Sequence, residues 1–167
     1  MATPSLEPTE ERIIAAVAST LGAIAAGSAY WYTPTVLRAD QYEDKRLYRT
    51  DKSPIYIVRD TSELVQSPSS RQFGKDARIL TVFILCAYND SRADKNPYST
   101  DSPTRGTIRH RMIRDVTKAL NANTRLGGAA IDLDVSDPTK DFEEGLGTWI
   151  LAEVPVAVLY EHAYDEP

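Results

Sequence analysis

Hydrophobic residues recur every three or four positions in the first part of the chain, at Ile13, Val17, Leu21 and Ile24. This spacing is typical of one face of an amphipathic helix. Thr9 is a favourable N-cap residue, and the two glutamates after it interact well with the positive end of the helix dipole. The pattern therefore predicts a helix that begins at Pro8–Glu11 and ends at Gly27-Ser28.

A second helical pattern occupies the region after residue 104, with a buried stripe at Ile108, Met112, Val116, Ala119 and Leu120. Turn-forming residues precede it, so the helix is predicted to start near Ser102–Thr104. Gly127-Gly128 supplies a stop that needs positive φ. Basic residues gather on the solvent side of this helix, at Arg111, Arg114 and Lys118.

Three segments between the helices have the pattern of strands. Residues 30–42 alternate between apolar and polar side chains, but Pro34 confines such a strand to an edge or a bulge. Residues 53–59 predict a second strand, and residues 77–88 are apolar on both alternating faces, which predicts a central strand covered on both sides. The polar residues 61–77 are predicted to be a connecting loop, and residues 88–106 a mobile loop or arm.

Two further strands are predicted after the second helix. Residues 129–135 alternate, with Ile131, Leu133 and Val135 pointing inward, and residues 148–164 form a long final strand interrupted at Pro155. The chain has 167 residues, 42% of them hydrophobic, which suits one soluble domain spanning residues 1–167. The order of elements predicts an α+β fold, a mostly antiparallel sheet packed with two main helices.

The net charge of −5 conceals an uneven distribution. Six basic residues and one acidic residue, Asp115, lie between Arg105 and Arg125, whereas ten acidic residues and one basic residue lie from Ala129 onward. The later segment carries −9, which leaves +4 on the residues before it. Such polarity suits subunits that meet complementary faces of their neighbours. It equally suits a basic helix packed beside acidic strands within one subunit.

The uncharged stretch from Ile13 to Leu37 raises the question of a membrane or export segment. It consists mainly of small, weakly apolar residues, it contains Pro34, and its N-terminal flank is net acidic where a signal peptide requires positive charge. The helical spacing explains it better. We therefore predict no targeting segment and no membrane partner.

Candidate chemistry is sparse. The single cysteine, Cys86, lies inside an apolar run and is predicted to be a buried, inert thiol. Asp132, Asp134, Ser136 and Glu143 match calcium-loop spacing, but Asp137 occupies the position where that loop needs glycine. The aspartates are instead predicted to be the solvated face of a strand, and we expect no metal and no cofactor.

A hydrolase built from His110, Asp132 and either Cys86 or a serine is the rival from another functional class. His162 is the only other histidine, and no motif positions such a group. The glycine pair follows a helix and precedes a strand, the reverse of a dinucleotide-binding motif. The basic stripe lacks interleaved aromatic residues and the chain is acidic overall, which disfavours a dedicated nucleic-acid binder.

The order of elements resembles that of the tail terminator (tail completion) proteins of long-tailed bacteriophages. The segments that carry the resemblance are "ERIIAAVASTL", "SPIYIVR", "ARILTVFILCAY", "IRHRMIRDVTKALN" with "TRLGGAAIDLDV", and "TWILAEVPVAVLYEH". It covers most of the chain, although none of these motifs is specific alone. The resemblance implies a structural, non-enzymatic subunit of a six-membered ring. Such a ring caps the head-proximal end of the tail tube, ends tail elongation and joins tail to head.

The same resemblance implies the partners: further copies of the chain, the tail tube protein and a head-completion or connector protein. DNA would only pass through the lumen, and the protein would belong to the virion neck after assembly in the host cytoplasm. The long 88–106 loop and Pro155 depart from the pattern and leave open another neck component, a head-closure or adaptor protein. The residues expected at a subunit or partner interface are Arg92, Lys95, Tyr98, Arg105, Arg111, Arg114 and Lys118.

Overall fold

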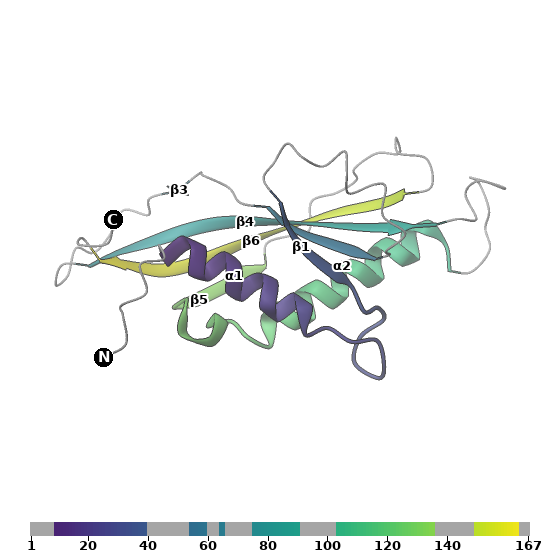
Figure 1. Ribbon diagram of the computed structural model, residues 1–167, viewed down its shortest axis with the longest axis horizontal. Helices are drawn as coiled ribbons and strands as arrows, with labels where there is room; N and C mark the ends of the chain where they lie inside the picture. Colours follow the sequence, from purple (N-terminus) through teal and green to yellow (C-terminus); the bar gives the residue numbers. More distant parts are fainter. Residues whose placement is uncertain are drawn as a thin grey trace.

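The computed structural model describes residues 9–39, 54–59, 64–65, 75–90, 103–135 and 149–163. Two helices lie on the same side of an elongated, twisted sheet (Figure 1). The helices are α1 (Thr9–Gly22) and α2 (Arg105–Asn121), and a short 3-10 turn, η3 (Leu126–Gly128), follows α2. The strands are β1 (Thr35–Ala39), β2 (Ile55–Arg59), β3 (Leu64–Val65), β4 (Lys75–Asn89), β5 (Asp132–Val135) and β6 (Trp149–Ala163).

The sheet has the strand order β1-β2-β4-β6-β5, and β3 pairs with β4 beside this path. β1 and β2 are parallel, and every other pairing is antiparallel. The two longest strands, β4 and β6, pair along their whole length, from Lys75↔Ala163 to Asn89↔Trp149. The predicted α+β fold, two helices packed on a mostly antiparallel sheet, is therefore confirmed.

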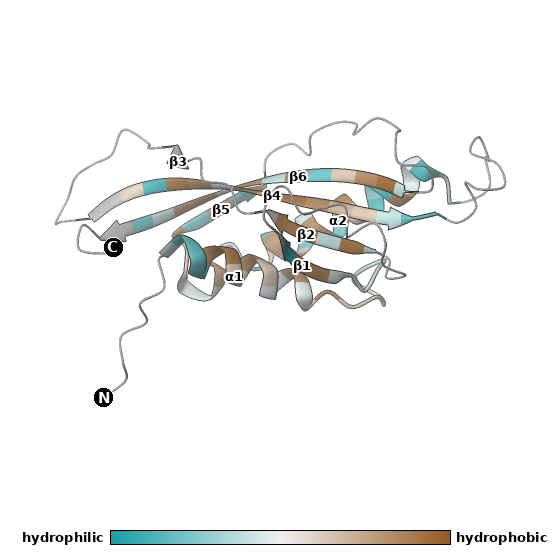
Figure 2. Cartoon of the chain, turned by 45° about the horizontal axis from the view of Figure 1, so that its top comes forward, coloured by the Kyte–Doolittle hydropathy of each residue, from teal (hydrophilic) through white to brown (hydrophobic). Residues whose placement is uncertain are grey.

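The main core lies between the two helices and the sheet. Its helical side is formed by the predicted stripes, which include Ile13, Val17, Ile108 and Met112, all at most 1% exposed. β4 and β6 supply the sheet side, where hydrophobic residues run along both strands (Figure 2). Full burial of one such side chain contributes about 1.5–3 kcal/mol relative to exposure. Packing against the sheet, more than intrinsic propensity, therefore fixes both helices.

A smaller cluster lies on the opposite face of the sheet, at Ile55, Ile57, Leu85, Ala87 and Leu151. The alternation along β4 explains the division, because successive side chains point to opposite faces. The prediction of a central strand covered on both sides is confirmed for the part of β4 around Leu85–Ala87. Ile79 and Phe83, nearer the other end, are only half-buried.

The first helix is shorter than the sequence predicts. It ends at Gly22, and the amide of Ile24 donates to the carbonyl of Leu21 in a tightened last turn, so the predicted end at Gly27-Ser28 is wrong. Gly22 does not adopt the positive φ of a glycine C-cap, but glycine weakens a helix because it loses more backbone freedom than other residues. Ile24 is still buried, and the chain then continues irregularly to Pro34. The expected 30–42 strand correspondingly begins only at Thr35, as edge strand β1.

Two predictions about the C-terminal strands need correction. β6 continues through Pro155, which pairs with Phe83, so the proline does not interrupt the strand. Pairing with β5 stops at Val156, so position 155 has no β5 partner among the described residues, and proline is tolerated beside such an unpaired stretch. Ile131, predicted to point inward, is 42% exposed because it precedes an edge strand. Leu133 is buried as predicted.

The loop predicted over residues 88–106 is shorter than expected, because regular structure extends into it from both sides. Tyr88 and Asn89 belong to β4, while Arg105 and Gly106 belong to α2, whose N-cap is Thr104. Within the described part of the chain, neither helix is long and apolar enough to cross a membrane.

Candidate functional site

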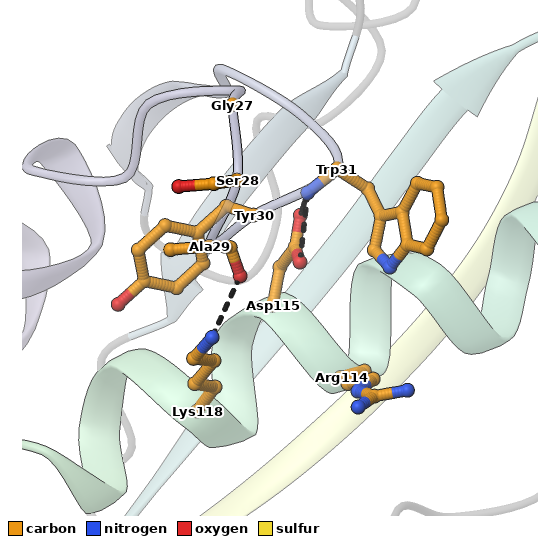
Figure 3. A pocket seen from close by; sticks show the side chains of 8 residues that line it. All are labelled: Gly27, Ser28, Ala29, Tyr30, Trp31, Arg114, Asp115 and Lys118. Atoms are coloured by element: carbon orange, nitrogen blue, oxygen red, sulfur yellow. Dashed lines mark hydrogen bonds between the residues drawn. The ribbon is translucent and has the colours of Figure 1, made fainter.

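The segment between α1 and β1 is fastened to the middle of α2 by one buried carboxylate. Asp115 is 1% exposed, and its Oδ2 accepts hydrogen bonds from the backbone amides of Trp31 at 2.9 Å and Tyr32 at 3.0 Å. Its Oδ1 lies 3.1 Å from the same Trp31 nitrogen. Figure 3 shows the carboxylate directed at the Trp31 amide. Hydrogen bonds to an ionised acceptor are stronger than neutral ones, so this contact orders the segment.

Three titratable groups near Asp115 have raised pKa values. Burial raises the pKa of Cys86 and of Tyr56, and the negative charge of Asp115 raises both further. Burial likewise raises the pKa of Tyr32, which Arg111 opposes through a hydrogen bond. These groups therefore stay neutral beneath α2.

Two basic residues of α2 pack on the aromatic residues of the fastened segment. The guanidinium carbon of Arg111 lies 4.0 Å from the centre of the Trp31 ring. Lys118 Nζ lies 5.3 Å from the Tyr30 ring centre and donates to the carbonyl of Ala29 at 2.8 Å. Cation–π contacts at exposed sites contribute about 0.5–1 kcal/mol each. They hold Tyr30 and Trp31 against the helix.

Tyr30, Trp31, Arg111, Arg114 and Lys118 thus form one continuous surface, here named the aromatic–basic surface. A pocket of about 200 Å³ opens in it, lined by residues 27–31 and by Arg114, Asp115 and Lys118 (Figure 3). Trp31 remains 52% exposed in spite of its contact with Arg111. Tryptophan, tyrosine and arginine are the residues enriched at the energetic centres of protein interfaces. The arrangement suits a contact with another protein.

The structure brings together only part of the predicted interface. Arg111, Arg114 and Lys118 lie on the aromatic–basic surface. Arg105 lies at the start of α2 and donates to the carbonyl of Trp149. Arg105 and Lys118 are thirteen positions apart on the helix, about 20 Å at the usual rise. Arg92, Lys95 and Tyr98 lie outside the described residues.

Sequence reasoning missed the aromatic half of this surface. The basic stripe has no aromatic neighbours along the chain, but the fold brings Tyr30 and Trp31 to it from 80 or more positions away. Two signals pointed there: three consecutive aromatic residues before Pro34, and a single acid within a basic helix. An isolated acid on an otherwise basic helix favours an internal partner for that acid.

The residues of the rival hydrolase are separated by their environments. Cys86 is fully buried with a raised pKa, as predicted for an inert thiol, whereas His110 is exposed on α2. Asp132 and Asp134 are exposed on β5, which confirms their prediction as a solvated strand face. Among the described residues, no three His, Cys, Asp or Glu side chains are grouped to hold a metal ion. Ser136, Asp137, Glu143 and the side chain of His162 lie outside the described part.

Comparison of the chain with known protein families and with curated proteins finds no match.

Proposed function

We propose that this protein is a structural subunit of a phage tail terminator. In this role it forms a ring of about six copies on the head-proximal end of the tail tube, ends tube elongation and presents the surface that joins the head. The observation that carries the proposal is the aromatic–basic surface, a preformed contact surface on an α+β subunit of the kind that the sequence resemblance implies. A structural subunit of this kind needs surfaces that bind its neighbours and needs no catalytic residues.

The preordering of that surface supports a contact role. A loop that orders only on binding loses conformational entropy at that moment, which weakens association. Here Asp115 already fixes the backbone at Trp31 and Tyr32 in the single chain. A subunit that must join several neighbours in a defined geometry benefits from contact residues that are already in place.

The sheet supports the proposal through its two edges. β1 and β5 are the outermost strands of the strand path, and each is only four or five residues long. Edge strands expose backbone donors and acceptors that a neighbouring chain can use. The partners in this proposal are other copies of the chain, the tail tube protein and the head-completion or connector protein, with DNA passing through the lumen. Another neck component, a head-closure or adaptor protein, would use the same kind of surface.

Native mass spectrometry of the full chain over a concentration series tests the ring, and mixing with tail tubes tests its role. We expect a closed species of about six subunits, and tubes that stop elongating when the protein is added. A stable dimer, or a chain that neither forms rings nor binds tube ends, would overturn the proposal. Rings that bind the head connector but not the tube would instead assign the protein to the other side of the neck.

A further inference from the structure

We infer that the aromatic–basic surface of one copy docks on the β5 edge of the next copy, in a head-to-tail contact. The β5 edge is defined here as Ile131, Asp132 and Asp134. This inference rests on the proposed ring and names the two surfaces that would build it. It is carried by the positions of exposed hydrophobic and charged side chains among the described residues.

The described residues expose two large hydrophobic side chains, Trp31 at 52% and Ile131 at 42%. Trp31 is flanked by the cations Arg111, Arg114 and Lys118. Ile131 is followed by the exposed carboxylates of Asp132 and Asp134. Trp31 therefore lies among positive charges and Ile131 beside negative charges, so the two sites are complementary in charge. A hydrophobic contact with complementary charge around it is the usual anatomy of a specific interface.

The internal contacts argue against neutralisation of these charges within one subunit. Lys118 and Arg111 are directed at the 29–32 segment. Among the described residues, no cation forms an ion pair with Asp132 or Asp134. Arg114, Asp132 and Asp134 are all exposed, so their charges face outward. This favours the intersubunit explanation of the uneven charge distribution.

The two surfaces lie apart on the subunit. In Figure 1 the loop between α1 and β1 lies below the sheet and to the right of β5. Among the described residues β5 pairs with β6 alone, and the Ile131 amide donates to the Leu159 carbonyl on that same strand, so β5 is an edge of the described sheet. Contacts between two different patches are heterologous, and their repetition closes into a ring when the rotation allows.

Cysteine cross-linking tests the contact directly. Trp31→Cys and Ile131→Cys are made as separate variants, each at an exposed position, so that the fold is retained, while native Cys86 is buried. When the two are mixed and mildly oxidised, we expect disulfide-linked heterodimers in excess over their statistical share. A chain carrying both substitutions should give a ladder of linked oligomers that ends at the ring. Dominant 31–31 homodimers would show a symmetric dimer and overturn the inference, and a purely statistical mixture would also overturn it.

Charge exchange gives an independent test. Asp132→Lys with Asp134→Lys should raise the concentration needed for half-assembly by about tenfold or more, because like charges would then meet. Adding Arg114→Glu and Lys118→Glu to that chain should restore assembly. The control exchanges the two cations, Arg114→Lys with Lys118→Arg, and should assemble like the wild type. Unfolding midpoints of all variants separate misfolding from lost contact.

The outcomes for this contact and for the proposed function are distinct. If the wild-type chain forms rings that cap tubes and the charge-reversed edge variant does so equally well, the ring stands and the docking contact is wrong. If the wild type does not cap tubes while the 31–131 link still forms selectively, the contact stands and the assembly belongs to another structure. Assembly that does not weaken with added salt would also contradict the charge complementarity.

Discussion

Asp115 and Trp31 lie 84 positions apart in sequence, yet the carboxylate of one holds the backbone amide of the other at 2.9 Å. Because the Tyr32 amide also donates to the same oxygen, one side chain of α2 determines the path of the chain between α1 and β1. The exposed Trp31 ring is a consequence of that path, with Arg111 packed on its face. The buried acid thus connects the core to the candidate contact surface.

Replacing Asp115 by Ala should lower the free energy of unfolding by about 2–4 kcal/mol, because two backbone amides would lose a charged acceptor inside the protein. Chemical denaturation measures this loss. Trp31 fluorescence, read in a Trp149→Phe background, should shift as the segment loosens. The control is Arg114→Ala, an exposed change on the same helix, which should stay within about 0.5 kcal/mol of the wild type. Equal stability of the two variants would contradict a fastening role for Asp115.

The sequence predicted the parts of the fold that depend on periodicity. The stripe containing Ile108 and Met112 is the buried face of α2, and Leu133 points into the core between exposed aspartates. Gly127 and Gly128 adopt the predicted positive φ angles, 66° and 97°, but they do not end α2, which stops at Asn121 with Ala122 as its C-cap. The glycine pair lies in the 3-10 turn that follows. These features follow from local spacing and local backbone preference, which a sequence displays directly.

The candidate site was only half predictable, for a physical reason. Arg111, Arg114 and Lys118 share a helix face, and helical spacing alone brings them together. Trp31 and Tyr30 reach them through a long-range contact that depends on where α1 ends and on a buried carboxylate. The prediction that α1 continues to Gly27-Ser28 shifted that segment into regular structure. The effect of Pro155 on the final strand was also predicted wrongly. A proline is tolerated there because β5, as described, does not reach the position that would pair with residue 155.

Cys86 should resist modification for as long as the protein is folded. Its side chain is fully buried on β4 and burial raises its pKa, so the reactive thiolate is scarce and inaccessible at about pH 8. A chromogenic disulfide reagent should give no signal with the native chain and one thiol per chain after denaturation. Rapid labelling of the native protein would reopen the hydrolase that uses this cysteine.

Two tyrosines that are fully buried in the described part of the chain should respond oppositely to loss of their hydroxyl groups. Tyr56 and Tyr160 are both 0% exposed, but in the described part of the chain the Tyr56 hydroxyl has no hydrogen-bond partner, whereas the Tyr160 hydroxyl donates to Glu10 at 2.8 Å. A buried polar group without a partner costs about 1–3 kcal/mol. Tyr56→Phe should therefore stabilise the protein by about 1 kcal/mol, and Tyr160→Phe should destabilise it by a similar amount. Thermal and denaturant unfolding of both variants measure the difference, and destabilisation by Tyr56→Phe would reveal an unseen partner such as a buried water.

The ion pair between α1 and β1 should make a small, pH-dependent contribution to stability. The two terminal guanidinium nitrogens of Arg38 donate to the Glu11 carboxylate, at 2.6 and 2.9 Å. These hydrogen bonds lower the pKa of Glu11 below its usual 4.5, and partial burial opposes this effect. A lowered folded-state pKa means that the unfolded chain binds the proton more readily. The stabilisation is therefore fully present above the unfolded pKa and is lost as the pH falls through the folded value.

Arg38→Gln removes the pair and keeps a polar side chain at the same edge-strand position. The two side chains are 34% and 39% exposed, so solvent screening limits the expected loss of stability to about 0.2–1 kcal/mol near pH 7. The difference between variant and wild type should shrink as the pH falls below about 4 and disappear under more acidic conditions, where Glu11 is protonated in both states. Denaturant unfolding at a series of pH values measures this difference, and NMR titration should show the pKa of Glu11 rising in the variant. A difference that persists unchanged at low pH would mean that Arg38 stabilises β1 by packing its apolar stem instead of by its charge.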